Sequence, residues 1–480
     1  MNVLENLEPK KVFSFFEEMT KIPHGSGNEK EISNYLVNFA KKRNLEVIQD
    51  SSLNVIIKKN ATSDYESVPP VIIQGHMDMV CEKNKDVSHD FENDALKLQV
   101  QEDYIYASGT TLGADNGIAV AFGLALLDSN DIPHPALEIL VTTGEETGMY
   151  GAIGLDPKHL NGKVLLNIDS EEEGVFLVSC AGGATNYVNI KNQWEENENT
   201  ALKLEIKGLK GGHSGMEIIK QRGNANKIIG RLLLAISKEI NVNIAHISGG
   251  AKNNAIPRES EVVLTTKSTN IEKIKTIANN MLEIFKMELK VEDPDIQLEI
   301  TETKSQKHLT CEVTNKIISF LNLMPNGVQT MSKDIEGLVE SSLNLGVIDF
   351  NEEEVTFISA VRSSVKSLKL EILEKIEVLA KLINAEVITD SSYPEWQFEQ
   401  NSKIRELCVK TYKEINGKEP KIDAIHAGLE CGLLKEKMHD VDMISFGPNL
   451  YDVHTPQEHM SISSVKRVWE FIKKLLENTK

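Results

Sequence analysis

The chain has 480 residues, of which 40% are hydrophobic, and this length exceeds what one core usually supports, so we expect two domains. Its net charge of -20 would repel phosphate groups, which argues against a nucleic-acid partner. The five scattered cysteines, the absence of a membrane-spanning apolar run and the absence of a secretory signal predict a soluble, cytoplasmic protein with reduced thiols and no membrane partner.

The N-terminal part of the chain alternates between strand and helix patterns. Ser26 and Glu29 match the capping box that begins many helices, and apolar residues at helical spacing follow them. Further apolar runs predict strands at residues 69–78, 136–146 and 163–174, and a helix at residues 115–129. The alternation is typical of an α/β domain with a mixed, largely parallel sheet.

The middle of the chain has a different texture. After a polar stretch near residue 188, the pattern reads strand, helix, two strands, helix, strand, and a similar order then recurs. The tail returns to α/β character. We therefore expect residues 188–396 to form an inserted α+β domain built of two similar halves. Residues 1–187 and 397–480 would then form one domain together.

Several side chains with metal-binding or acid–base chemistry follow the predicted strands. His76 and Asp78 are two residues apart, so on a strand they would share a face, and the carboxylate could orient the imidazole. Asp115 stands between a glycine-rich turn and a helix, where a simple helix cap is the alternative. Open α/β sheets place their ligands at such strand ends.

Later segments add further candidates. Glu145 and Glu146 are adjacent at a strand end, so one could bind a metal while the other handles a proton; an exposed surface pair is the alternative. Asp169 ends the apolar strand "VLLNID". His454 and His459 lie in "DVHTPQEHMS", where either could instead be an ordinary surface residue.

The joint pattern is more informative than any single residue. Histidines and carboxylates at the strand ends of one sheet form the ligand set that proteins use for two zinc, cobalt or manganese ions. Such a pair polarises a carbonyl group and lowers the pKa of water. The sequence therefore predicts metal-assisted hydrolysis.

Seven stretches in order also resemble a known family. They are "GHMDMV", "GTTLGADNGIAVA", "TTGEETGMYGA", "NIDSEEEG", "GGHSGMEIIKQRGNANK", "GGAKNNAIPRE" and "HTPQE". Together they resemble the M20 metallopeptidases, and within them the aminoacyl-histidine dipeptidases, also called Xaa-His or beta-alanyl-histidine dipeptidases. The resemblance covers nearly the whole chain and implies a zinc-peptidase-like catalytic domain with an inserted lid.

The resemblance implies roles for particular residues. One metal ion would be held by His76, Asp115 and Asp169, and a second by Asp115, Glu146 and His454. Asp115 would bridge the two ions and precede a cis peptide bond. Asp78 would orient His76, Glu145 would be the general base, and His459 would not be a ligand.

The resemblance also implies substrate contacts. His213 in "GGHSG" would stabilise the oxyanion of the reaction, with a turn residue as the alternative. Arg362 is a candidate for binding the carboxylate of the substrate, with a surface ion pair as the alternative. Glu430 in "HAGLECG" could receive the substrate amino group, and a tight turn there is the alternative.

The leading hypothesis is a cytosolic dipeptidase with two metal ions, most readily zinc, that cleaves short peptides with a free carboxyl end, including Xaa-His dipeptides. A tripeptidase or an N-acyl amino acid deacylase would use the same metal site. A non-catalytic metal-binding homologue usually lacks a ligand or the base, whereas this chain has all of them. A homodimer is the oligomer to expect first.

Overall fold

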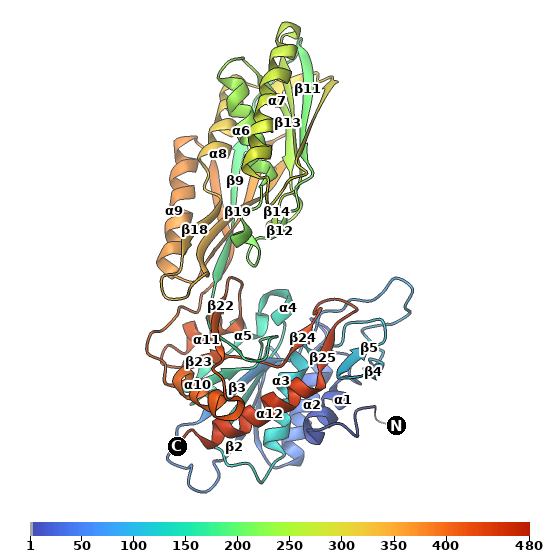
Figure 1. Cartoon of the computed structure of the whole chain (residues 1–480), viewed down its shortest axis with the longest axis vertical. Helices are drawn as coiled ribbons and strands as arrows, with labels where there is room; N and C mark the ends of the chain where they lie inside the picture. Colours follow the sequence, from blue (N-terminus) through green and yellow to red (C-terminus); the bar gives the residue numbers. More distant parts are fainter. Residues whose placement is uncertain (1–2) are drawn as a thin grey trace. The chain divides into compact units, whose positions relative to one another are not determined.

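The computed structural model describes residues 3–480, which divide into two compact units. Unit 1 comprises Met1–Ser179, Phe398–Ala424 and Leu429–Lys480, and unit 2 comprises Cys180–Gln397 and Ile425–Gly428. Figure 1 shows the N-terminal (blue) and C-terminal (red) segments together in unit 1. Unit 2 is therefore largely one segment that interrupts unit 1 in the sequence.

The boundary predicted at residues 187 and 188 is wrong, because it falls inside a strand, β9 (Gly182–Lys191). The strand continues past residue 188 because Val188 and Ile190 have their side chains in the core of unit 2. The polar residues that follow include the short strand β10 (Trp194–Glu196), which pairs with β17 (Lys307–Leu309).

The main sheet of unit 1 is mixed with a parallel centre, as predicted. Its order is β1-β2-β6-β3-β7-β23-β8-β22. Neighbours among β6, β3, β7 and β23 pair parallel, whereas β1, β2 and β8 pair antiparallel. The strands are β1 Glu46–Gln49, β2 Val55–Lys59, β3 Val71–His76, β6 Leu137–Thr142, β7 Val164–Asn167, β8 Val175–Cys180, β22 Lys421–Ile425 and β23 Asp442–Ser445.

Helix α3 (Ala114–Leu127) is the most buried helix of unit 1, because every residue in it except Asp115 is buried. It contacts α1 and β3, which explains why it has no polar face. The other helices are α1 Lys10–Met19, α2 Lys30–Lys42, α4 Glu145–Gly148, α5 Tyr150–Gly154, η1 Pro157–His159, α10 Lys403–Asn416, α11 Glu430–Lys437 and α12 Ile462–Glu477. A smaller sheet has the order β24 Leu450–Tyr451, β25 His459–Ser461, β5 Tyr104–Ala107 and β4 Leu98–Gln101.

Unit 2 contains the predicted repeat. Its large sheet has the order β16-β11-β15-β13-β19-β20-β9-β21, with β18 also paired to β19. The first half follows the chain as β11, α6, β13, β15, α7, β16, and the second half repeats this order as β9, α8, β19, β20, α9, β21. Corresponding strands lie at mirrored places in the sheet order, and β13 joins β19 at the centre. The prediction of two similar halves is confirmed.

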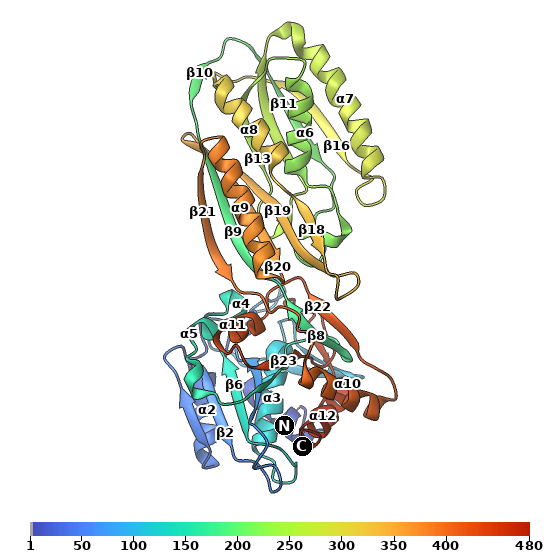
Figure 2. The same ribbon diagram turned by 90° about the vertical axis from the view of Figure 1, so that its left-hand side faces the viewer.

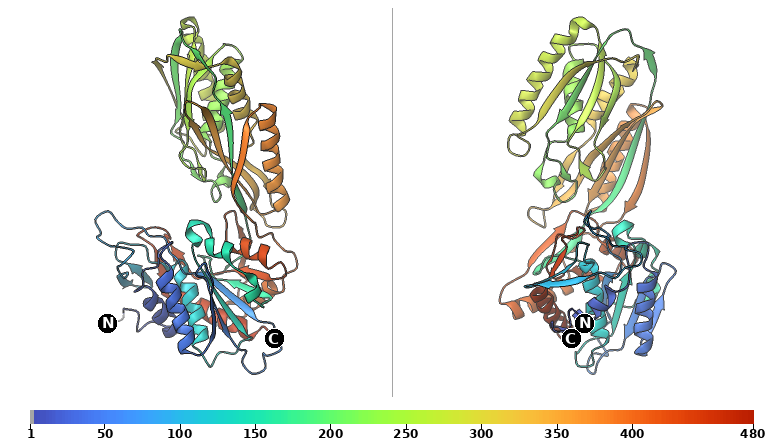
Figure 3. Two further views of the ribbon diagram at one scale, coloured as in Figure 1. Left: turned by 180° about the vertical axis from the view of Figure 1, so that it is seen from behind. Right: turned by 90° about the vertical axis from the view of Figure 1, so that its right-hand side faces the viewer.

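The helices of unit 2 cover one face of this sheet (Figure 2), and the opposite face, seen from the other side in Figure 3, carries none of the described helices. Apolar residues of α6, α8 and α9 form one core with the sheet. The helices are α6 Ala225–Ser237, η2 Ile218–Lys220, η3 Ser268–Asn270, α7 Ile271–Glu288, α8 Cys311–Leu323 and α9 Lys366–Leu382. The remaining strands are β11 Thr200–Lys207, β12 Gly212–His213, β13 Asn243–Gly249, β14 Ala255–Ile256, β15 Ser260–Thr266, β16 Gln297–Thr303, β17 Lys307–Leu309, β18 Gly327–Met331, β19 Val339–Phe350, β20 Glu354–Ser363 and β21 Glu386–Tyr393.

Across residues 3–480, no helix combines the length and the apolar character that crossing a membrane requires.

Candidate metal and catalytic site

The parallel centre of the unit 1 sheet brings the predicted ligands to one edge. His76 is the last residue of β3, Asp169 follows β7 by two residues, and Glu145 and Glu146 begin the short helix α4 just after β6. Because these three strands are parallel neighbours, their carboxyl ends lie along the same edge of the sheet. The sequence prediction of a strand-end cluster is confirmed for these positions.

Asp115 faces both histidines with different oxygens. Its Oδ1 lies 3.3 Å from Nε2 of His76, and its Oδ2 lies 3.2 Å from Nε2 of His454. Nε2 of His76 is also 3.5 Å from Oδ1 of Asp169, and Nε2 of His454 is 3.0 Å from Oε1 of Glu146. The site thus has two groups of donors that share one carboxylate, and this donor set fits two divalent ions.

The donor atoms of His76, Asp115 and Glu146 all lie within 4.8 Å of one another. The peptide bond between Asp115 and Asn116 is cis, as the family resemblance implies. His454 reaches the cluster from the loop between β24 and β25, at a positive φ of 62°. The cluster therefore combines residues from several distant parts of the chain.

Burial and mutual repulsion shape the electrostatics of the cluster. Burial raises the pKa of Glu145 well above its usual range and that of Asp169 to about 6. Burial also opposes the ionisation of Asp115, but hydrogen bonds with His454 and His76 hold the pKa of this carboxyl below its usual range. Hydrogen bonds to two carboxylates raise the pKa of His454 to about 11. The site concentrates negative charge that divalent cations would neutralise.

The prediction that Asp78 lies on the strand is wrong, because β3 ends at His76. The turn after the strand still brings the two residues together, with Oδ1 of Asp78 3.3 Å from Nδ1 of His76. The backbone N–H groups of Glu145 and Glu146 also donate to Asp78, at 3.1 and 3.3 Å. One carboxylate thus orients a histidine and fixes the start of α4, where both glutamates stand.

Ser26 has a role that sequence reasoning missed. The predicted capping box with Glu29 is wrong, because α2 begins only at Lys30 and Glu29 makes no side-chain cap. The Ser26 hydroxyl instead donates to Oδ2 of Asp78 over 2.8 Å. It therefore supports Asp78 from the side away from the histidine ring, and only the fold brings these two residues together.

Replacing Ser26 by alanine is expected to lower kcat/KM about tenfold, because a hydrogen bond to a carboxylate contributes about 1.5–3 kcal/mol and part of it is recovered by water. Steady-state kinetics of the hydrolysis that the sequence predicts would measure this loss. Ser63, which is exposed and has no described side-chain contact near the cluster, provides the matched control as Ser63→Ala. Equal kinetics for both variants would contradict the proposed support of Asp78.

Glu430 lies below the strand ends and not on an open surface. It has no exposed surface, and its Oε2 accepts hydrogen bonds from Gln74 and Thr142, each at 2.6 Å. Burial raises the pKa of this carboxyl to about 7. Its Oε1 has no hydrogen-bond partner among the described residues, and the contact with a substrate amino group stays a prediction.

His213 and Arg362 belong to unit 2. Nη1 of Arg362 donates to the Tyr393 hydroxyl at 3.0 Å, while its buried Nε has no hydrogen-bond partner among the described residues. Burial and the charge of Arg362 lower the pKa of His213.

Sequence reasoning missed His426, although it stands in the quoted stretch "HAGLECG". Burial and the charges of Arg362 and His213 lower the pKa of His426 to about 3.

The described contacts of His459 lie outside the group of residues around Asp115. Its ring stacks on Tyr106 and Tyr451, with centroids 4.8 and 4.9 Å away. The residue before it, Glu458, is a second group that sequence reasoning missed. The carboxylate of Glu458 binds the backbone at the start of α3.

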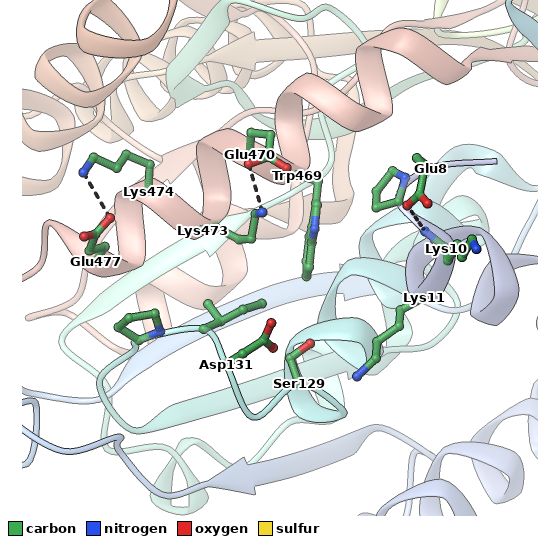
Figure 4. Close-up of a pocket in the computed structure, with 13 residues that line it drawn as sticks. Glu8, Lys10, Lys11, Ser129, Asp131, Trp469, Glu470, Lys473, Lys474 and Glu477 are labelled. Carbon is green, nitrogen blue, oxygen red and sulfur yellow. Dashed lines mark hydrogen bonds and ion pairs between the residues drawn. The ribbon is translucent and has the colours of Figure 1, made fainter.

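A separate pocket of unit 1, of about 490 Å³, lies between the start of α1 and the end of α12 (Figure 4). Two pairs of its charged side chains bind each other: Lys473 with Glu470, and Lys474 with Glu477. Its described lining residues include neither histidine nor cysteine. This pocket lacks the donor set found at the strand ends.

Comparisons with known proteins agree with this geometry. The sequence model of peptidase family M20/M25/M40 matches residues 72–478. The chain is 37% identical over 480 residues to the cytosol non-specific dipeptidase of Escherichia coli (strain K12), and the match covers 99% of both chains.

Solved structures give the same result. The crystal structure of aminoacylhistidine dipeptidase from Vibrio alginolyticus matches with a TM-score of 0.94 and 38% identity, over 99% of this chain and 97% of that one. The aminopeptidase PepT of Bacillus cereus matches with a TM-score of 0.58 and 16% identity, over 98% and 99% of the two chains, which shows a shared fold alone.

Proposed function

This chain belongs to peptidase family M20/M25/M40, and we propose that it is a dipeptidase that depends on two divalent metal ions. The observation that carries the proposal is Asp115, which turns one carboxylate oxygen toward His76 and the other toward His454. Shared carboxylates of this kind hold the two ions of hydrolytic metal pairs.

In this proposal, one ion would be held by His76, Asp115 and Asp169 and the other by Asp115, Glu146 and His454. When bound, such a pair polarises the carbonyl of the scissile peptide bond and lowers the pKa of water. Glu145 then takes a proton from the attacking water and gives it to the leaving amine. The partial burial of Glu145 supports this role, because burial moves the pKa of a carboxyl toward neutrality.

The relatives favour dipeptides over the alternatives. The two proteins that match almost the full chain at 37% and 38% identity are named as dipeptidases. A tripeptidase from Staphylococcus aureus matches with only 17% identity and a TM-score of 0.58. We propose substrates with a free amino end and a free carboxyl end, including Xaa-His dipeptides.

A ladder of substrates tests this specificity. The set contains Ala-His, Ala-Ala, Ala-Ala-His and N-acetyl-Ala-His, and each is measured at the same metal concentration. The proposal expects cleavage of the dipeptides and a large loss for the tripeptide and the acetylated peptide. Preferred cleavage of the tripeptide would favour a tripeptidase, and preferred cleavage of the acetylated peptide would favour a deacylase.

Arg362 is proposed to bind the carboxylate of the substrate, because its buried Nε has no partner among the residues the structure describes. Replacing it by alanine is expected to lower kcat/KM by about 10- to 100-fold, the size of a charged hydrogen bond of about 1.5–3 kcal/mol. A dipeptide with an amidated carboxyl end should be affected much less. Arg231→Ala, which removes an exposed ion pair with Glu288 in the same unit, is the control.

A uniform loss on both the acid and the amide substrate would contradict the role of Arg362.

His213 is proposed to donate a hydrogen bond to the oxyanion of the reaction, in the lid that unit 2 would form. The lowered pKa of His213 supports a neutral imidazole at working pH, which can donate through one ring nitrogen.

Three further features are proposals of the same kind. Zinc is the proposed ion, with cobalt and manganese as alternatives, because imidazole and carboxylate donors suit all three. A cytoplasmic location rests on the name of the Escherichia coli relative. A homodimer rests on the frequency of twofold oligomers, and the molar mass in solution would test it.

A further inference from the structure

Glu458 is a buried carboxylate that contacts none of the proposed ligand side chains but binds the backbone of one. It is 3% exposed and lies in the loop between β24 and β25. Its Oε2 accepts hydrogen bonds from the N–H groups of Leu112 and Gly113, at 2.7 and 3.1 Å. Its Oε1 accepts from those of Ala114 and Asp115, at 2.8 and 3.3 Å.

The N–H groups of Leu112 and Gly113 directly precede α3, and those of Ala114 and Asp115 are its first two; the N-cap residue Gly113 offers no side-chain cap. The first N–H groups of a helix have no partner within the helix and bind an anion well. Here the anion comes from a residue more than 300 positions away in the sequence. The carboxylate of Glu458 therefore takes the place of a local cap.

The backbone around Asp115 departs from regular helix geometry. Asp115 and Asn116 have non-helical angles, with φ and ψ of -81° and 102° at Asp115, so regular helix geometry does not fix the direction of the Asp115 side chain. Gly113 has a positive φ of 69°, which turns its N–H toward the carboxylate together with its neighbours. The four hydrogen bonds to Glu458 tie this turn to the loop between β24 and β25.

The loop that carries Glu458 also carries His454, four residues earlier. The N–H of Glu458 donates to the carbonyl of Thr455 at 3.0 Å, so this part of the loop is folded back on itself. His454 meets Oδ2 of Asp115 while Glu458 binds the backbone of the same residue. One short loop thus contacts both the side chain and the main chain of Asp115.

We propose that Glu458 is a positioning residue that sets the Asp115 carboxylate between His76 and His454, and so allows both metal ions to bind. This inference rests on the proposed function. Burying one more carboxylate beside an acidic cluster is unfavourable, and the four N–H groups offset part of that cost. Groups that orient a ligand typically change metal affinity by about 10- to 100-fold when they are replaced.

The test is metal binding by the full chain. Chelator-stripped wild type, Glu458→Gln and Glu458→Asp are titrated with zinc chloride by calorimetry, and the absorption spectrum is recorded after cobalt is added instead. Glutamine leaves some of the four N–H groups facing an amide N–H₂, and aspartate is one methylene shorter. Asp442→Asn is the matched control, since Asp442 accepts from Ser402 and Ile404 at the start of α10.

We expect the wild type and Asp442→Asn to bind two ions with the same cobalt spectrum. Both Glu458 variants should bind at least one ion about 10- to 100-fold more weakly, with an altered cobalt spectrum and an unchanged circular dichroism spectrum. Two-ion binding of wild-type affinity in a folded Glu458 variant would overturn the inference alone. A wild type that binds fewer than two ions would overturn the proposed function and this inference with it.

Discussion

Replacement of Glu145 by glutamine is expected to lower kcat by about a thousandfold to ten-thousandfold, near the upper end of what a general base contributes. Glutamine has nearly the same shape but cannot take up a proton. Glu145 is not among the side chains whose donor atoms surround Asp115, so the variant should still bind two metal ions. Steady-state kinetics on a dipeptide, with metal content measured on the same sample, would check both statements.

Glu172→Gln provides the control for Glu145→Gln. Glu172 is an exposed member of the acidic run after β7, and the loss of one exposed charge there should leave kcat unchanged. Full activity in a metal-loaded Glu145→Gln protein would show that another group takes the proton. A loss of metal together with activity would instead identify Glu145 as a ligand.

Replacement of Asp115 by asparagine is expected to reduce the bound metal from two ions to one or none, and to lower kcat/KM more than about a hundredfold, because a direct ligand matters more than the groups that orient it. Asparagine keeps one acceptor oxygen and turns an N–H₂ group toward one histidine. The shared carboxylate would then be lost while the side-chain shape is kept. Elemental analysis of dialysed protein and dipeptide kinetics would measure the two effects.

Asp442→Asn is again the matched control for Asp115→Asn, because it makes the same chemical change at a helix start outside the cluster. Two ions bound by Asp115→Asn with wild-type affinity would contradict the role of Asp115 as the shared ligand. If Asp115→Asn kept both metal ions but lost activity, the Asp115 carboxylate would act in catalysis in some way other than as a metal ligand.

The part of the candidate site that could be predicted from the sequence is the part where the local apolar pattern and the sheet topology agree. Three strands with continuous apolar runs had to be buried, and parallel pairing then brought His76, Glu146 and Asp169 to one edge. The repeat in unit 2 was visible in the element order, because the order of elements survives where residue identity does not. The sheet confirms it through the mirrored positions of the two halves.

The contacts that support the site were not predictable in the same way. Ser26 matched a local capping pattern, but a partner distant in the sequence, Asp78, binds its hydroxyl. Glu458 binds a helix start more than 300 residues earlier. Glu430 carried the chemistry of a substrate contact, yet its depth below the sheet edge is a property of packing. Pairings across such sequence distances follow from the complete fold and leave no local signal.

The most direct test of the account is dipeptide hydrolysis by chelator-stripped protein before and after zinc, manganese or cobalt is returned. We expect stripping to abolish the cleavage of Ala-His and one of these ions to restore it, with activity rising until two ions are bound per chain. Unchanged hydrolysis by protein shown to be free of metal would contradict the central claim that His76, Asp115, Glu146, Asp169 and His454 hold the ions on which catalysis depends.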